Sequence, residues 1–135
     1  MDALPNELPG SGTEAFTGLV CPDCGGNLVL RVENLLVSFH CRVGHAYSTD
    51  ELVISKEEEL EARLWMAVFG FAEFEALLRG LERHGLVGSL GMEACRARAA
   101  LAFRQAERLR RIVEGDQRIT PGPEASDDAA ESPTA

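Results

Sequence analysis

The chain has 135 residues, of which 22 are acidic and 13 are basic, so its formal net charge is −9. A strongly acidic chain is not broadly attracted to nucleic acid or to an anionic membrane, and the composition therefore disfavours both classes of partner. Hydrophobic residues make up 45% of the sequence, which is typical of a globular protein with one small domain or two sub-domains.

The first sixteen residues are poor in apolar residues and contain proline, glycine and acidic side chains, so residues 1–16 are predicted to be disordered. They have neither a basic start nor an apolar stretch of signal-peptide length. The four cysteines of the chain fit a reducing compartment better than a disulfide scaffold. We therefore expect a cytoplasmic protein.

Two pairs of metal-binding residue types follow. Cys21 and Cys24 are two residues apart, and Cys41 is followed by His45. Two thiolates at this spacing can be aimed at one point by a tight turn, and the second pair does the same with a longer arm. The four side chains together would complete a tetrahedral Cys₃His site. The sequence therefore predicts one structural Zn²⁺.

The segment between the two pairs predicts a β-hairpin. Residues 28–32 and 35–41 are rich in β-branched and apolar side chains, and Glu33 and Asn34 form the predicted turn between them. An isolated two-stranded hairpin is marginal in water, so the metal is needed to hold it. Residues 17–48 are therefore predicted to be a zinc ribbon, a two-stranded hairpin with two zinc knuckles.

Cysteine pairs and histidines also occur in redox sites and in catalytic zinc sites. A thioredoxin-type redox pair requires a helix after its second cysteine, whereas glycines and strands follow here. A catalytic zinc keeps an open position with three protein ligands, whereas four ligands fill the shell. His40 lies beside Cys41 and could compete with His45, but neighbouring side chains of a strand point to opposite faces.

The sequences of residues 19–28 (LVCPDCGGNL) and 39–48 (FHCRVGHAYS) resemble the zinc-ribbon extension that follows the methylesterase domain in some chemotaxis proteins of the CheB type. The resemblance covers roughly residues 17 to 114 and implies a link to chemotaxis-like signalling. No serine of the chain lies in a Gly-x-Ser-x-Gly turn, and no catalytic domain precedes Cys21 in this sequence. The resemblance therefore implies a detached accessory module, and we expect no enzymatic activity.

Residues 49–114 predict two helices. Ser48 with Glu51 forms a capping-box pattern, after which apolar residues recur every three or four positions. Gly85 is a predicted helix end and Ser89 a predicted cap of the second helix, which runs to about Glu114. Alanines on the second helix would face bulky residues of the first, which favours an antiparallel α-helical hairpin.

Two groups of helical residues are candidates for contact with a partner. Trp65 and Phe69 belong to an aromatic cluster too wide for one stripe, so part of it packs on the ribbon near Phe39 or on another molecule. The second group consists of Arg104, Arg108 and Arg111. These arginines either face a protein partner or solvent, or bind phosphate in a nucleic acid.

The tail, residues 115–135, contains prolines and acidic residues and is predicted to be disordered. The predicted fold is a small α+β protein, a zinc ribbon followed by a helical hairpin. The predicted function is a non-catalytic zinc-binding interaction or regulatory module, acting through a protein partner or self-association. The alternatives are a nucleic-acid-binding ribbon with an arginine-rich helix and an accessory subunit of a separately encoded methylesterase.

Overall fold

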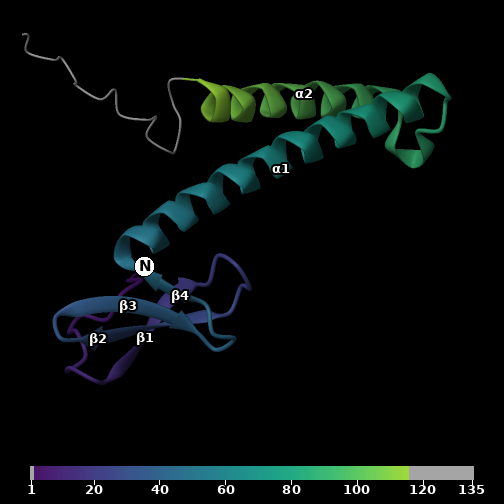
Figure 1. The fold of residues 1–135 in the computed structure, drawn as a ribbon. Helices are drawn as coiled ribbons and strands as arrows, with labels where there is room; N and C mark the ends of the chain where they lie inside the picture. Colours follow the sequence, from purple (N-terminus) through teal and green to yellow (C-terminus); the bar gives the residue numbers. More distant parts are fainter. Residues whose placement is uncertain (1, 116–135) are drawn as a thin grey trace, which may run out of the picture. The chain divides into compact units, whose positions relative to one another are not determined.

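The structure is a computed structural model that describes residues 2–115 (Figure 1). The prediction for the tail concerns residues 116–135 and lies outside the described residues. The described residues divide into two compact units, residues 2–63 and 64–115, and the boundary falls within the first helix.

The first unit contains one antiparallel sheet with four strands in sequence order. The strands are β1 (Glu14–Val20), β2 (Asn27–Glu33), β3 (Leu36–Cys41) and β4 (Ala46–Ser48). Together with two helices they make a small α+β protein, as the sequence predicts. The prediction of two strands was incomplete, because β2 and β3 are extended on both sides by β1 and β4.

The turn between β2 and β3 is a two-residue hairpin turn. Asn34 and Leu35 both have positive φ, at 48° and 68°, and Glu33 pairs with Leu36 across them. Two successive left-handed residues are the mark of a turn whose twist matches that of the strands. The predicted hairpin is therefore present, with its turn one residue later than the sequence indicated.

Strand β1 lies partly in the segment predicted to be disordered. Its Phe16 pairs with Val29 of β2, and the Thr17 hydroxyl donates to the carbonyl of Leu28 at 2.6 Å. These bonds come from β2, which is distant in sequence, so no local pattern announces the strand. The sheet begins at Glu14, which is three residues before the predicted start of the ribbon at residue 17.

The core of the sheet unit lies beneath one face of the sheet. Leu28 and Leu30 alternate with partly exposed residues along β2, as expected for a strand with one buried face. Each such side chain contributes about 1.5–3 kcal/mol by leaving water. The buried cluster consists of Cys21, Leu28, Leu30, Phe39, Cys41, Tyr47 and Leu52. Leu52 belongs to the helix that follows, so the start of that helix is attached to the sheet.

Helix α1 (Thr49–Arg83) begins at the predicted capping box. The Ser48 amide donates to Oε2 of Glu51 at 2.8 Å, and the Glu51 amide donates to the Ser48 hydroxyl at 3.2 Å. Two backbone donors at the helix start are thus satisfied reciprocally. The hydrogen bonds from Ser48 lower the pKa of the Glu51 carboxyl.

Replacing Ser48 by alanine should destabilise the sheet unit by about 1 kcal/mol, because the Glu51 amide loses its acceptor. A matched control is Thr49→Ala, which changes the neighbouring hydroxyl residue at the first helical position. Thermal unfolding followed by circular dichroism should show a midpoint several degrees lower for the first variant than for the second. Equal midpoints would contradict the cap.

Helix α1 ends where the sequence predicts. Gly85 has φ of +68°, and its amide donates to the carbonyl of Glu82 at 3.1 Å. The Leu86 amide donates to the carbonyl of Leu81 at 2.8 Å. This pair of bonds around a left-handed glycine is a Schellman end, which satisfies carbonyls that the helix leaves free.

Helix α2 (Met92–Glu114) starts two residues later than the predicted cap at Ser89 implies. Ser89 lies in a short 3₁₀ turn, Gly88–Leu90, and the residue before α2 is Gly91, which makes no side-chain cap bond. The prediction for Ser89 was therefore wrong. The φ of +84° and ψ of 158° at Gly91 favour glycine, and this backbone geometry fixes the helix start.

The two helices touch within the second unit. Leu78 of α1 packs against Cys95 and Ala99 of α2, and Nε of Arg96 donates to Oε1 of Glu82 at 2.5 Å. The buried residues of α2 are mostly small: Cys95, Ala99, Ala102, Ala106 and Val113. Small residues allow close approach to a neighbouring helix. Within residues 2–115, neither helix is long and apolar enough to cross a membrane.

Candidate metal centre

Four side chains from separate parts of the sheet unit converge at one point. The Sγ atoms of Cys21, Cys24 and Cys41 and a ring nitrogen of His45 all lie within 4.8 Å of one another. Cys21 follows β1, Cys24 precedes β2, Cys41 ends β3, and His45 precedes β4. The sheet therefore brings together the four residues that the sequence singled out, in an arrangement compatible with a metal site.

The individual distances are short. Sγ of Cys24 lies 3.6 Å from Sγ of Cys41. Nδ1 of His45 lies 3.3 Å from Sγ of Cys41 and 3.6 Å from Sγ of Cys21. Nδ1 is thus the imidazole atom that faces the sulfurs, and the cluster is one compact group.

Each half of the cluster is shaped by a tight turn that ends in a glycine. The Gly25 amide donates to the carbonyl of Cys21 at 2.9 Å, and the Gly44 amide donates to the carbonyl of Cys41 at 3.2 Å. Both glycines have positive φ, at 73° and 112°, which a side chain would strain. The first turn places Cys24 just before its glycine, and the second, which is one residue shorter, places His45 just after its glycine.

Backbone amides make two of the thiols more acidic. Burial raises the pKa of the Cys41 thiol, but amides that include those of His45 and Val43 outweigh burial and lower it to about 7. Burial also raises the pKa of Cys21, and the Tyr47 hydroxyl and nearby backbone amides reverse this effect and lower it. Hydrogen bonds of this kind favour the thiolate, which is the form that binds a metal.

Cys24 behaves differently. The Gly26 amide favours its thiolate, but burial and the sulfurs of Cys21 and Cys41 together raise the pKa of Cys24. Thiolates placed this close repel one another, and a bound cation would reduce that repulsion. The electrostatics of the cluster therefore favour occupation by a cation.

Tyr47 and Asp23 lie directly against the cluster and were not singled out by the sequence. The Tyr47 hydroxyl donates to Oδ2 of Asp23, and it lies 3.3 Å from Sγ of Cys21. Burial, the bond to Asp23 and the neighbouring sulfur raise the pKa of Tyr47 far above its ordinary value of 10. The phenol is therefore neutral and available as a donor. The sequence held one signal for Tyr47: it is two residues after His45, and residues at this spacing in an extended segment point to the same side.

His40 lies outside the cluster. Its Nε2 is 2.8 Å from the Ser38 hydroxyl, and its Cα partners are Val29 and Ala46. Cys41, the next residue, points into the core. The alternation of the strand therefore separates His40 from Cys41, and His40 is not part of the cluster.

The predicted partner residues lie on the helices. Trp65 is half-buried and stacks with Phe69, with ring centroids 5.9 Å apart, and Phe69 is 63% exposed. Arg104, Arg108 and Arg111 are all exposed on α2. The aromatic pair lies on α1, and the three arginines lie on α2.

The fold and the cluster define a small α+β protein with a Cys₃His group. In the comparisons with known proteins, no family model, no curated protein and no solved structure matches this chain.

Proposed function

We propose that this protein is a non-catalytic, zinc-binding interaction module of the cytoplasm, in which one Zn²⁺ holds a zinc ribbon together and the helices contact a protein partner. The observation that carries the metal assignment is the spacing of the four ligand atoms. Three sulfurs and one imidazole nitrogen form a soft-to-borderline donor set that suits zinc.

Three of the distances between ligand atoms can be compared with those of a tetrahedral zinc ion. With Zn–S bonds of about 2.3 Å and a Zn–N bond of about 2.0–2.1 Å, tetrahedral angles place two sulfurs about 3.8 Å apart and a sulfur and nitrogen about 3.5 Å apart. The observed values are 3.6 Å between Cys24 and Cys41, and 3.3 Å and 3.6 Å from His45 to its two sulfur neighbours. These three distances are close to those of tetrahedral zinc, and the other pairs of ligand atoms lie within 4.8 Å of one another.

A zinc held by all four side chains has no open position for a water or a substrate. Catalytic zinc sites keep such a position, whereas structural sites fill all four. This is the support for a non-catalytic role. The zinc would stabilise the sheet, and the first turn of α1 is attached to the core of that sheet through Leu52.

The helices themselves are proposed to form an antiparallel hairpin. Only residues 84–91 connect α1 to α2, and connections this short join antiparallel neighbours in helical proteins. The contact of Leu78 with Cys95 and Ala99 agrees with that pairing. Circular dichroism of residues 64–115 alone would test whether this unit folds by itself.

Native mass spectrometry of protein expressed without added zinc tests the metal assignment. We expect one Zn²⁺ per chain, and its removal by a chelator should reduce the sheet signal. A chain without zinc, in which Cys21 and Cys24 oxidise readily to a disulfide, would overturn the assignment and favour the redox interpretation.

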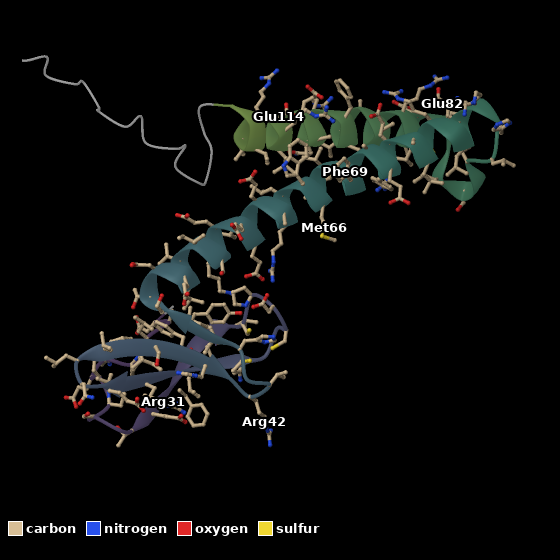
Figure 2. The ribbon with its side chains drawn as sticks, viewed as in Figure 1. Arg31, Arg42, Met66, Phe69, Glu82 and Glu114 are labelled. Carbon is tan, nitrogen blue, oxygen red and sulfur yellow. The ribbon has the colours of Figure 1, made fainter. Side chains whose placement is uncertain are left out.

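The helical unit exposes apolar side chains that its own core does not use. On α1, Met66, Phe69 and Leu77 are 73%, 63% and 56% exposed, and Figure 2 shows the Met66 side chain pointing away from α2. On α2, Leu101 and Phe103 are about half exposed. Exposed large apolar residues at this density are typical of a protein interface.

Charge makes a second copy the first partner to test. Helix α1 carries nine acidic and four basic residues, whereas α2 carries three acidic and six basic residues. A symmetric dimer that places α1 of one copy beside α2 of the other would pair opposite charges and cover apolar surface. A chemotaxis-type signalling protein is a further candidate, proposed only from the similarity of residues 19–28 and 39–48.

Phe69→Glu should convert a dimer into a monomer, because it places a charge in the proposed contact. Leu86→Glu is the matched control, since Leu86 is 66% exposed but lies beyond the end of α1. Light scattering coupled to size exclusion gives the mass of each variant. A wild-type chain that remains monomeric at high concentration would contradict self-association.

Nucleic-acid binding is the second candidate, favoured by the exposure of Arg104, Arg108 and Arg111 along one helix. These positions follow the i, i+4, i+7 spacing of one helical face. Binding to phosphate would fall steeply with salt concentration. Strong, salt-dependent retention on RNA or DNA would support this candidate over the protein partner.

A further inference from the structure

Tyr47 and Asp23 join the two halves of the candidate metal centre. Asp23 lies in the turn between Cys21 and Cys24, whereas Tyr47 lies on β4, two residues after His45. The hydroxyl of Tyr47 donates to Oδ2 of Asp23. This side-chain bond joins the turn between Cys21 and Cys24 to β4, the strand that follows His45. It does not involve a metal.

The position of Tyr47 is itself tightly fixed. Its side chain is 8% exposed and belongs to the core cluster of the sheet, and its backbone pairs with Phe39 of β3. Because His45 and Tyr47 are two residues apart on an extended segment, both point to the same side, toward the cluster. A buried ring therefore holds the hydroxyl at a defined place beside the sulfurs.

The hydroxyl has one proton and two neighbours that accept hydrogen bonds. They are the Asp23 carboxylate and, at 3.3 Å, Sγ of Cys21. The Tyr47 hydroxyl is the donor in its bond to Asp23, so the proton points to Asp23. The Asp23 side chain is thereby tethered to Tyr47, and the turn that carries Cys21 and Cys24 is held in place.

We propose that Tyr47 and Asp23 form a clamp that positions the first cysteine pair for zinc, and that this clamp sets the affinity of the site. The inference rests on the proposed zinc site. Residues just outside a coordination shell orient the ligands, and their loss typically lowers metal affinity ten- to hundredfold. Without the clamp, the turn that contains Asp23 must be ordered by the metal itself, at an entropic cost.

Tyr47→Phe tests the clamp, because it keeps the buried ring and removes only the hydroxyl. Zinc affinity, measured by competition with a chromophoric chelator, should fall ten- to hundredfold, and transfer of zinc to the chelator should become faster. Ser38→Ala is the matched control. It removes a hydroxyl that bonds His40, which lies outside the cluster, and it should leave zinc affinity unchanged.

A double-mutant cycle separates the clamp from general destabilisation. If the two residues act as one unit, Asp23→Ala should cost as much affinity as Tyr47→Phe, and the double variant should be no worse than either. Asp23→Asn keeps a carbonyl oxygen that can accept the phenol proton, so it should retain part of the affinity.

The outcomes are distinct. Unchanged affinity in Tyr47→Phe, or losses that simply add in the double variant, would overturn the clamp. Recovery of affinity when Asp23→Ala is added to Tyr47→Phe would also overturn it, because Asp23 would then be a competitor for the metal and not a partner of Tyr47. Failure of the wild-type chain to bind zinc would instead overturn the proposed metal site. Zinc binding by the wild-type chain is therefore measured first.

Discussion

Cys41→Ser is expected to abolish stable zinc binding and to unfold the sheet unit. Serine is a hard, neutral ligand at neutral pH, and the site would lose its central thiolate, whose sulfur lies against both Cys24 and His45. Structural zinc contributes about 10–16 kcal/mol of apparent binding free energy, which exceeds the typical net stability of a small domain. Zinc analysis with nuclear magnetic resonance should show metal-free protein with collapsed dispersion of the sheet signals.

The helices are expected to persist in part in this variant, since the contact of Leu78 with Cys95 and Ala99 lies outside the sheet unit. Cys95→Ala is the matched cysteine control. It removes a buried thiol that is not part of the cluster, so one zinc per chain should remain. A full metal complement and unchanged thermal stability in Cys41→Ser would count against the site.

The four clustered side chains could be predicted from the sequence because chelation imposes a local rule. Two ligands separated by a short turn must satisfy one spacing whatever the rest of the chain does, and glycines at positions 25 and 44 accompany both turns. The capping box of Ser48 and Glu51 and the glycine end of α1 are equally local. Each of these features was predicted from a few adjacent residues.

Strand β1 could not be predicted in the same way. Its residues alternate only weakly, Gly18 interrupts them, and the preceding segment has a composition typical of disorder. The strand exists because β2 supplies its hydrogen bonds, in pairs such as Ala15 with Leu30 and Phe16 with Val29. A strand whose pairing partner is ten or more residues away in sequence cannot be recognised from its local pattern alone.

The Tyr47–Asp23 bond illustrates the same limit at the site. Strand alternation places Tyr47 on the side of His45, but nothing in the sequence indicates that its hydroxyl reaches the turn at residue 23. Only the antiparallel pairing of β3 with β4, which sets Tyr47 opposite Phe39, brings the two together. Side-chain bonds between distant turns depend on sheet register, which local composition does not fix.

Leu78→Ala is expected to destabilise the helical unit by about 2–5 kcal/mol, because it leaves a cavity against Cys95 and Ala99. Leu78 is 3% exposed, and its neighbour Leu77 is 56% exposed, so Leu77→Ala is a control of identical chemistry on the adjacent position. Urea unfolding followed by the helical circular dichroism signal gives the free energy of unfolding of each variant. Zinc content should be unchanged in both.

The comparison of these two leucines also bears on the partner. In an isolated chain, Leu77→Ala should cost well under 1 kcal/mol, because the side chain is already largely in water. A cost that approaches that of Leu78→Ala, and that grows with protein concentration, would mean that a second copy covers Leu77. Equal, small costs for both variants would contradict the helix contact itself, since a residue as buried as Leu78 must then lack the packing that the structure gives it.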